Sequence, residues 1–298
     1  MNDAAASDWA LDRASIDGAL ATIADRLDPS VDRSVADAIR YGLLGGGKRM
    51  RGLLFLAAYR TAGGTGDASA LAAAIETVHS YSLVHDDLPC MDDDDMRRGR
   101  PTVHKVYGVQ AATAAGVAMV PLAASAGFSA ARSLGLGPVA CGRVVATLMR
   151  ASGAGGMIGG QLLDLDGEGK PLSIEDLERI HRAKTGALIS AATELGGVAA
   201  SASETRIAAL RDFGMAIGLA FQIADDVLDI TATTDRLGKT AGRDLDLHKS
   251  TYPALMGVDR ARERARSLVD DGCAGLRAAG LLSTELDALA RFVVERES

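Results

Sequence analysis

The stretch "ALAAAIETVHSYSLVHDD", residues 70–87, is rich in alanine and contains no glycine or proline. Within it, His79, Ser82 and Asp86 lie three or four residues apart, a spacing that places side chains on one face of an α-helix. Pro89 follows shortly afterwards, and a proline ends or kinks a helix. The stretch therefore predicts a helix that ends near Pro89 and carries polar side chains along one face.

The helical pattern continues on both sides of this stretch. A helical run ends near Leu44, where three glycines follow, and "RMRGLLFLAAYRTA" ends at Gly63, as glycines at helix C-termini predict. Ser173 with Asp176 forms a capping-box start for the helical stretch "IEDLERIHRAKTGALISAATELGG". No strand-length alternation of β-branched residues is present. The sequence predicts a single all-α domain over residues 1–298.

Composition narrows the classes of function. The chain has 298 residues, is 48% hydrophobic and carries a formal net charge of −7, without a basic stripe, so nucleic acid is not an expected partner. Its three cysteines are far apart and form no CxxC pair, which favours a reducing cytoplasm over a disulfide framework or a zinc site. The N-terminal residues show no basic region followed by an apolar region, so no signal peptide is expected.

One uncharged stretch, Val106 to Ala131, has the length of a membrane span. It consists mostly of alanine, glycine, serine and threonine, and Pro121 lies inside it. Membrane spans are usually richer in leucine, isoleucine, valine and phenylalanine. We therefore expect a buried helix pair here and no membrane span.

The stretch "FQIADDVLD" brings carboxylates onto a helical pattern that begins near Ile207. Asp225 and Asp229 are four residues apart and share a helix face, with Phe221 and Gln222 about one turn earlier. Like charges at this spacing destabilise a helix unless something binds them. The pattern predicts a bound cation.

A second cluster of carboxylates lies in "HDDLPCMDDDDMRRGRP", residues 85–101. Asp86 and Asp92 are six residues apart, which is not one helix face, but a bend at Pro89 would return Asp92 toward Asp86. The further aspartates are either supporting groups or solvated charges, namely Asp93, Asp94 and Asp95. The cluster lacks the alternating ligands, glycine and closing glutamate of an EF-hand.

Paired hard oxygen ligands favour Mg²⁺, which usually takes one or two carboxylates together with phosphate oxygens of a substrate. Basic residues lie near both clusters and in "GGGKRMR", and they would bind the remaining oxygens of a polyphosphate. They are Lys48, Arg49, Arg51, Arg97, Arg98, Lys184, Lys239 and Lys249, with Thr185 beside Lys184. The P-loop pattern GxxxxGK[ST] is absent.

Five stretches together resemble the trans-isoprenyl diphosphate synthases, with bacterial farnesyl diphosphate synthases as the nearest type. They are "GGGKRMR", "HDDLPCMDDDDMRRG", "GGQLLDLDGEG", "KTGALI" and "FQIADDVLD". The resemblance implies an isoprenoid synthase bundle of helices around a central cavity, with the two aspartate clusters facing each other across its mouth. It also implies a homodimer and typically three Mg²⁺ ions per active site.

The resemblance also implies the roles of individual residues. The Mg²⁺ ligands would be Asp86, Asp92 and Asp225, supported by Asp87, Asp226 and Asp229. The allylic diphosphate would be bound by Arg97, Lys184 and Lys239, helped by Gln222, Thr185 and Lys249. Isopentenyl diphosphate would be bound without metal by Lys48, Arg51, His79 and Arg98. For His79 the alternative is a core histidine with a satisfied hydrogen bond.

The implied reaction needs no protein nucleophile. Mg²⁺ and the cations neutralise charge on the leaving diphosphate while apolar walls exclude water from the allylic carbocation. The isopentenyl double bond attacks that carbon, and the released diphosphate takes the proton that is lost. Asp86, Asp92, Asp225, Arg97, Lys184 and Lys239 would form the catalytic group.

Product length depends on the floor of the cavity. Tyr81 lies five residues before Asp86, about 7.5 Å along a helix, and Ser82 is its neighbour. In the family, a bulky residue there and a two-residue insertion such as "PC" in the first motif accompany a short product. We expect C15 farnesyl diphosphate, with C20 geranylgeranyl diphosphate as the alternative. Tyr81 could instead point elsewhere, leaving the floor to other residues.

The chain departs from the family at Val109 and Val117, which stand where relatives usually have glutamate and aspartate, and at Pro121. These changes lie in a helix expected near the cavity, so rate or product length could differ.

A terpene cyclase and a non-catalytic partner subunit are weaker alternatives. The second motif differs from that of cyclases, and partner subunits usually lose aspartates that this chain keeps.

Overall fold

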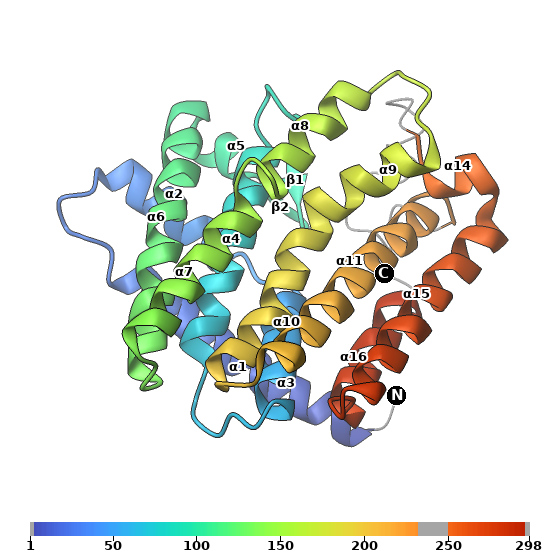
Figure 1. Ribbon diagram of the computed structural model, residues 1–298. Coiled ribbons are helices and arrows are strands. Elements are labelled where there is room, and N and C mark those ends of the chain that lie inside the picture. The colour runs from blue at the N-terminus through green and yellow to red at the C-terminus, as the bar shows by residue number, and fades with distance from the viewer. Residues whose placement is uncertain (1–2, 232–249, 296–298) are drawn as a thin grey trace. The chain divides into compact units, whose positions relative to one another are not determined.

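Helices make up nearly all regular structure in this computed structural model, which describes residues 3–231 and 250–295 (Figure 1). The all-α prediction is confirmed. The chain divides into two compact units, Met1–Leu56 with Thr65–Met149 and Ala57–Gly64 with Arg150–Ser298. Helices α3 and α7 carry the chain from one unit into the other. The expectation of a single domain stays a prediction.

The first unit is built around one buried helix, α4, which packs against α1 and α6 (Figure 1). Its elements are α1 (Asp3–Asp25), α2 (Arg33–Leu43), the start of α3 (Met50–Thr61), α4 (Ser69–Asp86), β1 (Met96–Arg97), β2 (Arg100–Pro101), α5 (Val103–Tyr107), α6 (Val109–Ser133) and most of α7 (Pro138–Ser152). Residues 71–78 of α4 are all buried. Their many small alanines allow neighbouring helices to approach closely, and this holds the C-terminal turns of α4 in a fixed place.

The second unit is built around α11, which packs against α10 and α15 (Figure 1). Its elements are the end of α3, α8 (Met157–Gly167), α9 (Ile174–His181), the π-helix η1 (Arg182–Gly186), α10 (Ala187–Ala199), α11 (Glu204–Thr231), α14 (Tyr252–Met256), α15 (Val258–Ala278) and α16 (Thr284–Glu295). Leu210 and Ile217, which follow the predicted start of the helical pattern near Ile207, are completely buried. This burial fixes the orientation of the carboxylates near the end of α11.

The predicted helix boundaries agree with the structure at most ends. The Oγ atom of Ser173 accepts a hydrogen bond from the backbone N–H of Asp176 at 3.1 Å, so α9 begins at the predicted capping box. The predicted helical stretch after Ser173 is helical throughout residues 174–199 but is not all α, because residues 182–186 form a π-helix. Single π turns inside helices occur frequently at functional sites.

Helix α6 runs through Pro121 without a break. A proline inside a helix removes one backbone hydrogen bond and usually kinks the helix. Val117, the residue four positions before this proline, is 61% exposed.

Candidate active site

The first aspartate motif (residues 86–95) begins where α4 ends. Asp86 is the last residue of α4, and the backbone N–H of Asp92 donates to the carbonyl oxygen of Asp86 at 2.8 Å. The N–H of Asp93 donates to the carbonyl of Leu88 at 3.1 Å, which closes the loop around Pro89. The predicted bend therefore exists, and it brings the backbones of Asp86 and Asp92 together despite their six-residue spacing.

The arginines after this motif lie on a β-hairpin. Strands β1 and β2 pair Arg97 with Arg100, and the two-residue loop between them, Arg98 and Gly99, has positive φ at both positions. This is the geometry of a type I′ turn, in which glycine avoids a steric cost. The hairpin was not predicted, since its strands have only two residues each.

Arg97 is held by carboxylates of the first motif. Its Nε donates to Oδ1 of Asp87 at 2.9 Å, and its Nη2 lies 3.2 Å from Oδ2 of Asp94. Burial raises the pKa of Asp87, and the charge of Arg97 opposes only part of that shift. Asp87 thus orients an arginine in addition to its predicted metal role, while Asp94 is a supporting group.

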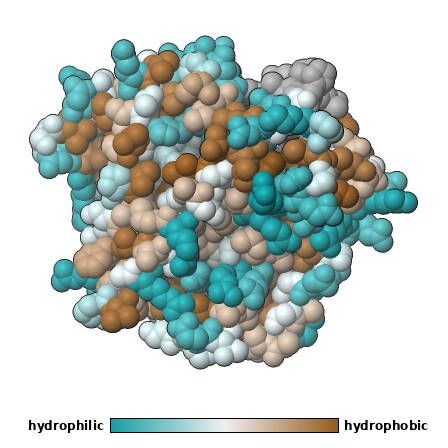
Figure 2. All heavy atoms as spheres, turned by 45° about the horizontal axis from the view of Figure 1, so that its top comes forward, coloured by the Kyte–Doolittle hydropathy of each residue, from teal (hydrophilic) through white to brown (hydrophobic). Residues whose placement is uncertain are grey.

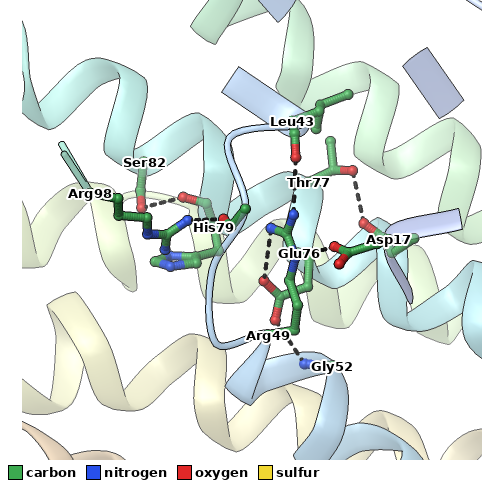
Figure 3. A network of polar contacts seen from close by, with 11 residues as sticks. Asp17, Leu43, Arg49, Gly52, Glu76, Thr77, His79, Ser82 and Arg98 are labelled. Carbon is green, nitrogen blue, oxygen red and sulfur yellow. Dashed lines mark hydrogen bonds and ion pairs between the residues drawn. The ribbon is translucent and has the colours of Figure 1, made fainter. Parts of the chain in front are cut away.

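The residues predicted to bind isopentenyl diphosphate come from three parts of the first unit. Lys48 is exposed in the segment after α2, Arg51 is half-buried in the first turn of α3, and His79 lies on α4. Arg98 extends from the hairpin toward His79, and its Nη1 donates to the carbonyl oxygen of Gly46 (Figure 3). The hairpin and the glycine-rich segment are therefore joined where Arg98 approaches His79.

His79 has the environment of a binding residue. Its Nδ1 atom is buried and has no hydrogen-bond partner among the described residues, which argues against a satisfied core histidine. Burial first, and then the charges of Arg51, Arg98 and two further arginines, lower the pKa of His79 well below its usual value. The ring is therefore neutral near pH 7 and can form a hydrogen bond with an anion.

Tyr81 lies buried on α4, where the ring packs edge-on against the ring of His85 at a centroid distance of 5.1 Å. A Cβ atom at Gly116 of α6 would meet the His85 ring at 2.2 Å, so α6 packs directly against His85. The hydroxyl of Ser82 donates to the carbonyl of His79 at 2.8 Å. Of the two predicted length-setting residues, Tyr81 supplies bulk, while the Ser82 hydroxyl bonds to its own helix.

The second aspartate motif (residues 225–229) lies on α11 in the second unit. Asp225 is half-buried, whereas Asp226 and Asp229 are buried. The side chain of Asp226 accepts from the backbone N–H of Tyr252 at 3.1 Å and from Nε2 of Gln222 at 3.3 Å. Its Oδ2 is also 3.3 Å from Nε2 of His181. Protein groups therefore fix Asp226 in place.

His181 and Tyr252 had no predicted role. Their rings stack with a centroid distance of 5.8 Å, and the Tyr252 hydroxyl donates to Oε1 of Glu178 at 2.8 Å. Burial and this acidic partner raise the pKa of Tyr252. His181 stands three residues before Lys184 and Tyr252 three residues after Lys249, but nothing in their spacing links them to Asp226.

The π-helix η1 carries Lys184 and Thr185. The Lys184 Nζ atom is 2.6 Å from Oδ2 of Asp164 on α8, and the Thr185 hydroxyl donates to Oε1 of Gln222 at 2.9 Å. These contacts bring Lys184, Thr185 and Gln222 to the same part of the second unit. Sequence reasoning missed Asp164. Lys239 and Lys249 lie outside the described residues.

Gln161 on α8 is also unassigned by sequence reasoning. Its amide is buried, and neither Oε1 nor Nε2 has a hydrogen-bond partner among the described residues. Buried amides without partners are uncommon and require an explanation, such as a water or a ligand. The residue stands in "GGQLLDLDGEG", so the motif could have drawn attention to it.

Comparison with known proteins assigns these motifs to a family. The model of the polyprenyl synthetase family matches residues 32–274. The chain belongs to the polyprenyl synthetase family. It is 45% identical over 277 residues to farnesyl diphosphate synthase of Escherichia coli, covering 90% of this chain and 91% of that one. Geranylgeranyl pyrophosphate synthase 7 of Arabidopsis thaliana is 41% identical over 271 residues, which cover 89% and 77% of the two chains.

Solved structures agree with this polyprenyl synthetase assignment. A geranyltransferase from Helicobacter pylori, complexed with magnesium and isoprenyl diphosphate, superposes with a TM-score of 0.82 at 30% identity. The alignment covers 99% of this chain and 97% of that one. The protein is therefore an enzyme, a prenyltransferase of isoprenoid biosynthesis with the all-α isoprenyl synthase fold.

Polyprenyl synthetases use Mg²⁺, and the residues of this chain fit the ion. Both motifs offer carboxylate oxygens, the hard ligands that Mg²⁺ prefers. Asp226 and Asp229 are buried, and burying carboxylates is costly without a compensating charge.

The first unit contains a further group of possible metal ligands whose ligand atoms lie within 4.8 Å of one another, namely Asp93, Asp95 and His104. There Asp95 is already paired with Lys105 at 2.7 Å.

Two helices of the described residues, α6 and α11, are long and apolar enough to cross a membrane by length and composition alone. Their most apolar windows are 39% and 56% buried, and a core helix meets the same criteria. Hydrophilic and hydrophobic residues are interspersed on the face drawn in Figure 2. These helices are therefore weak evidence for a membrane span.

Proposed function

We propose that this prenyltransferase condenses isopentenyl diphosphate with dimethylallyl and geranyl diphosphates, and that its main product is C15 farnesyl diphosphate. One observation carries the proposal. Within its last two turns, helix α4 presents His79, the buried ring of Tyr81 and Asp86. A single rigid element thus holds a candidate diphosphate ligand, a bulky candidate floor and the first candidate metal ligand. The similarity to the Escherichia coli farnesyl diphosphate synthase supports the same product.

Three Mg²⁺ ions would be held by Asp86, Asp92 and Asp225, with Asp87, Asp226 and Asp229 in support. When bound, Mg²⁺ neutralises negative charge on the allylic diphosphate. In the first unit, Arg97 is oriented by Asp87 and Asp94. In the second, Lys184 and Thr185 are oriented by Asp164 and Gln222. These donors, with Lys239 and Lys249, would bind the oxygens that carry the developing charge.

The second substrate is bound without metal. Lys48, Arg51 and Arg98 would bind the diphosphate of isopentenyl diphosphate, and neutral His79 would add a hydrogen bond. The allylic C1–O bond breaks, and its electron pair leaves with the diphosphate. The isopentenyl double bond then forms the new bond from its C4 to that allylic C1, and the released diphosphate accepts the proton lost from C2. The apolar residues of the cavity exclude water from the carbocation.

The proposal also covers the domain organisation, oligomeric state, metal ions, partners and location of the enzyme. We infer a single catalytic domain over residues 1–298, a homodimer, three Mg²⁺ ions per active site, no membrane span, no nucleic-acid partner and a cytoplasmic location. The family assignment and the absence of CxxC pairs support this setting.

Purified protein incubated with Mg²⁺, labelled isopentenyl diphosphate and C5, C10 or C15 allylic diphosphate tests the proposal. We expect C5 and C10 primers to be elongated to C15 and the C15 primer to remain unchanged. Elongation of the C15 primer to C20 would favour geranylgeranyl diphosphate synthase, an activity that the Arabidopsis relative carries in its name. No elongation of any primer would reject the proposal and favour a partner subunit or, if cyclic products appear, a terpene cyclase.

A further inference from the structure

The segment "GGGKRMR", residues 45–51, contains three cations with different surroundings. Lys48 is exposed and Arg51 is half-buried, whereas the side chain of Arg49 between them is only 3% exposed. Arg49 also has a φ of +52°, which is uncommon for a residue other than glycine. Its side chain thus points into the protein and cannot be a ligand on the same side as Lys48.

The buried guanidinium of Arg49 joins three helices. Its Nε donates to Oδ1 of Asp17 on α1 at 2.7 Å, and its Nη2 donates to the carbonyl of Leu43, the last residue of α2, at 3.3 Å (Figure 3). Its Nη1 lies 4.0 Å from Oε2 of Glu76 on α4, whose side chain is 2% exposed. The end of α2 is therefore tied to α1 and α4 through one side chain.

Glu76 extends this network to the far end of the segment. Its Oε1 accepts a hydrogen bond from the backbone N–H of Gly52 at 2.9 Å (Figure 3). Gly52 lies in the first turn of α3, where backbone N–H groups lack helical partners and a carboxylate is favoured. A Cβ atom at Gly52 would meet Ile16 Cδ1 of α1 at 2.8 Å, so the start of α3 also fits closely against α1.

These contacts fix both ends of the segment that carries Lys48 and Arg51. Glu76 stands three residues before His79 on the same helix, so the network and the predicted diphosphate ligands share a rigid support. Asp17 precedes residues 32–274, the part matched by the polyprenyl synthetase model. The family assignment therefore gives no role to this contact from α1.

We propose that Arg49 is a positioning residue for the metal-free diphosphate site, and that Asp17 of the N-terminal helix α1 holds Arg49 in place. The inference rests on the proposed function, because it gives Lys48, Arg51 and His79 their role. Arg49 and Asp17 do not touch the substrate. They fix the backbone from which Lys48 and Arg51 reach it.

Asp17→Asn is the main test, because the Asp17 side chain is 51% exposed and its loss leaves Arg49 paired with Glu76. We expect this change to raise the KM for isopentenyl diphosphate at least about fivefold. The KM for geranyl diphosphate and kcat should stay within about twofold of wild type. Asp25→Asn, the same chemical change at an exposed residue of α1, is the matched control and should change neither KM.

A second variant tests the guanidinium itself. Arg49→Lys keeps the charge but loses the planar fork that binds Asp17 and Leu43 together, so we expect a larger rise in the KM for isopentenyl diphosphate than with Asp17→Asn. In an Arg51→Lys background, Asp17→Asn should add little, since both changes act on one binding group. Full additivity of Asp17→Asn and Arg51→Lys, or an equal rise in both KM values, would overturn the proposal.

Calorimetric titration with inorganic diphosphate in EDTA separates this inference from the proposed function. Wild-type protein should bind the diphosphate, and Asp17→Asn should weaken that binding at least about fivefold while Asp25→Asn leaves it unchanged. If the wild-type protein fails to elongate any primer, the proposed function fails, and the titration still tests the positioning role. Unchanged diphosphate affinity in a folded Asp17→Asn variant would overturn the inference.

Discussion

His79 stands among positive charges on α4, directly after residues 71–78, which are all buried. The cations that lower its pKa are Arg49, Arg51, Arg97 and Arg98. A neutral imidazole is the form that such surroundings favour, since protonation would add a fifth positive charge to a partly desolvated group. The same charges that suppress protonation attract a diphosphate, so His79 is suited to hydrogen bonding and the arginines to charge neutralisation.

This environment makes stability depend on pH. Because the pKa of His79 is lower in the folded protein than in the unfolded chain, the unfolded chain binds the extra proton as pH falls below about 6.5. The free energy of unfolding should then decrease by up to about 1.4 kcal/mol per pH unit until the folded pKa is reached. Urea unfolding of wild type and His79→Gln at pH 7.5 and 5.5 measures this, and the variant should lose less stability on acidification. Equal losses in both proteins would contradict the expected pKa.

Tyr81 is the residue on which product length is expected to depend. Tyr81→Ala removes a buried ring and should shift the products from C15 toward C20, because a growing chain gains the space of that ring. The change should also cost about 3 kcal/mol of stability, so the assay must be run well below the melting temperature. Chromatography of labelled products measures the shift. Tyr81→Phe keeps the ring and should still give C15, and a product profile unchanged by Tyr81→Ala would show that another residue forms the floor.

Among the elements, the π-helix η1 shows most clearly how the backbone positions a functional side chain. Helix α8 passes so close to it that a Cβ atom at Gly160 would meet the backbone nitrogen of Lys184 at 2.2 Å. A Cβ atom at Gly218 of α11 would meet the Cα atom of Gly186 at 2.6 Å. Glycines on both neighbours thus let η1 fit between α8 and α11.

Gly160→Ala should push α8 and η1 apart and displace Lys184. We expect a loss of about 1–3 kcal/mol of stability, typical of overpacking, together with a higher KM for the allylic substrate. Thermal unfolding and steady-state kinetics measure the two effects. Gly142→Ala on α7, where an added Cβ atom meets nothing within 4 Å, is the control and should be neutral or slightly stabilising. A Gly160→Ala enzyme with unchanged allylic KM would show that the close approach does not position Lys184.

Helix ends were predictable from local chemistry, whereas contacts between helices were not. Pro89 and the Ser173 capping box act on helix ends within a few residues of themselves, so the local sequence is enough to predict where α4 ends and α9 begins. The π-helix at Lys184 depends on the glycines of two other helices, and its own residues suit an α-helix equally well. The sequence alone does not distinguish the role of Arg49 from that of Arg51. Only the contacts of Arg49 with the carboxylates of α1 and α4 show that Arg49 is the buried residue that joins these helices.

At the scale of the whole molecule, the proposed function requires two kinds of anion site. The first unit contains cations suited to a diphosphate without metal, and both units contain aspartate motifs that repel a diphosphate unless a cation binds between them. The sequence predicted both kinds through the family motifs. The central cavity that the resemblance implies follows from no local pattern and stays a prediction.

Ligand stabilisation should separate the two kinds of site. In EDTA, inorganic diphosphate should raise the melting temperature slightly, through the metal-free cations alone. With Mg²⁺ and diphosphate together the rise should be larger, since a ligand at 100 times its dissociation constant adds about 2.7 kcal/mol. Asp86→Asn removes a candidate metal ligand and should abolish only the Mg²⁺-dependent part, while the Asp25→Asn control keeps both parts. If Asp86→Asn reduced the rise in EDTA equally, the first motif would act on diphosphate without metal, and the assignment of Asp86 to Mg²⁺ would be wrong.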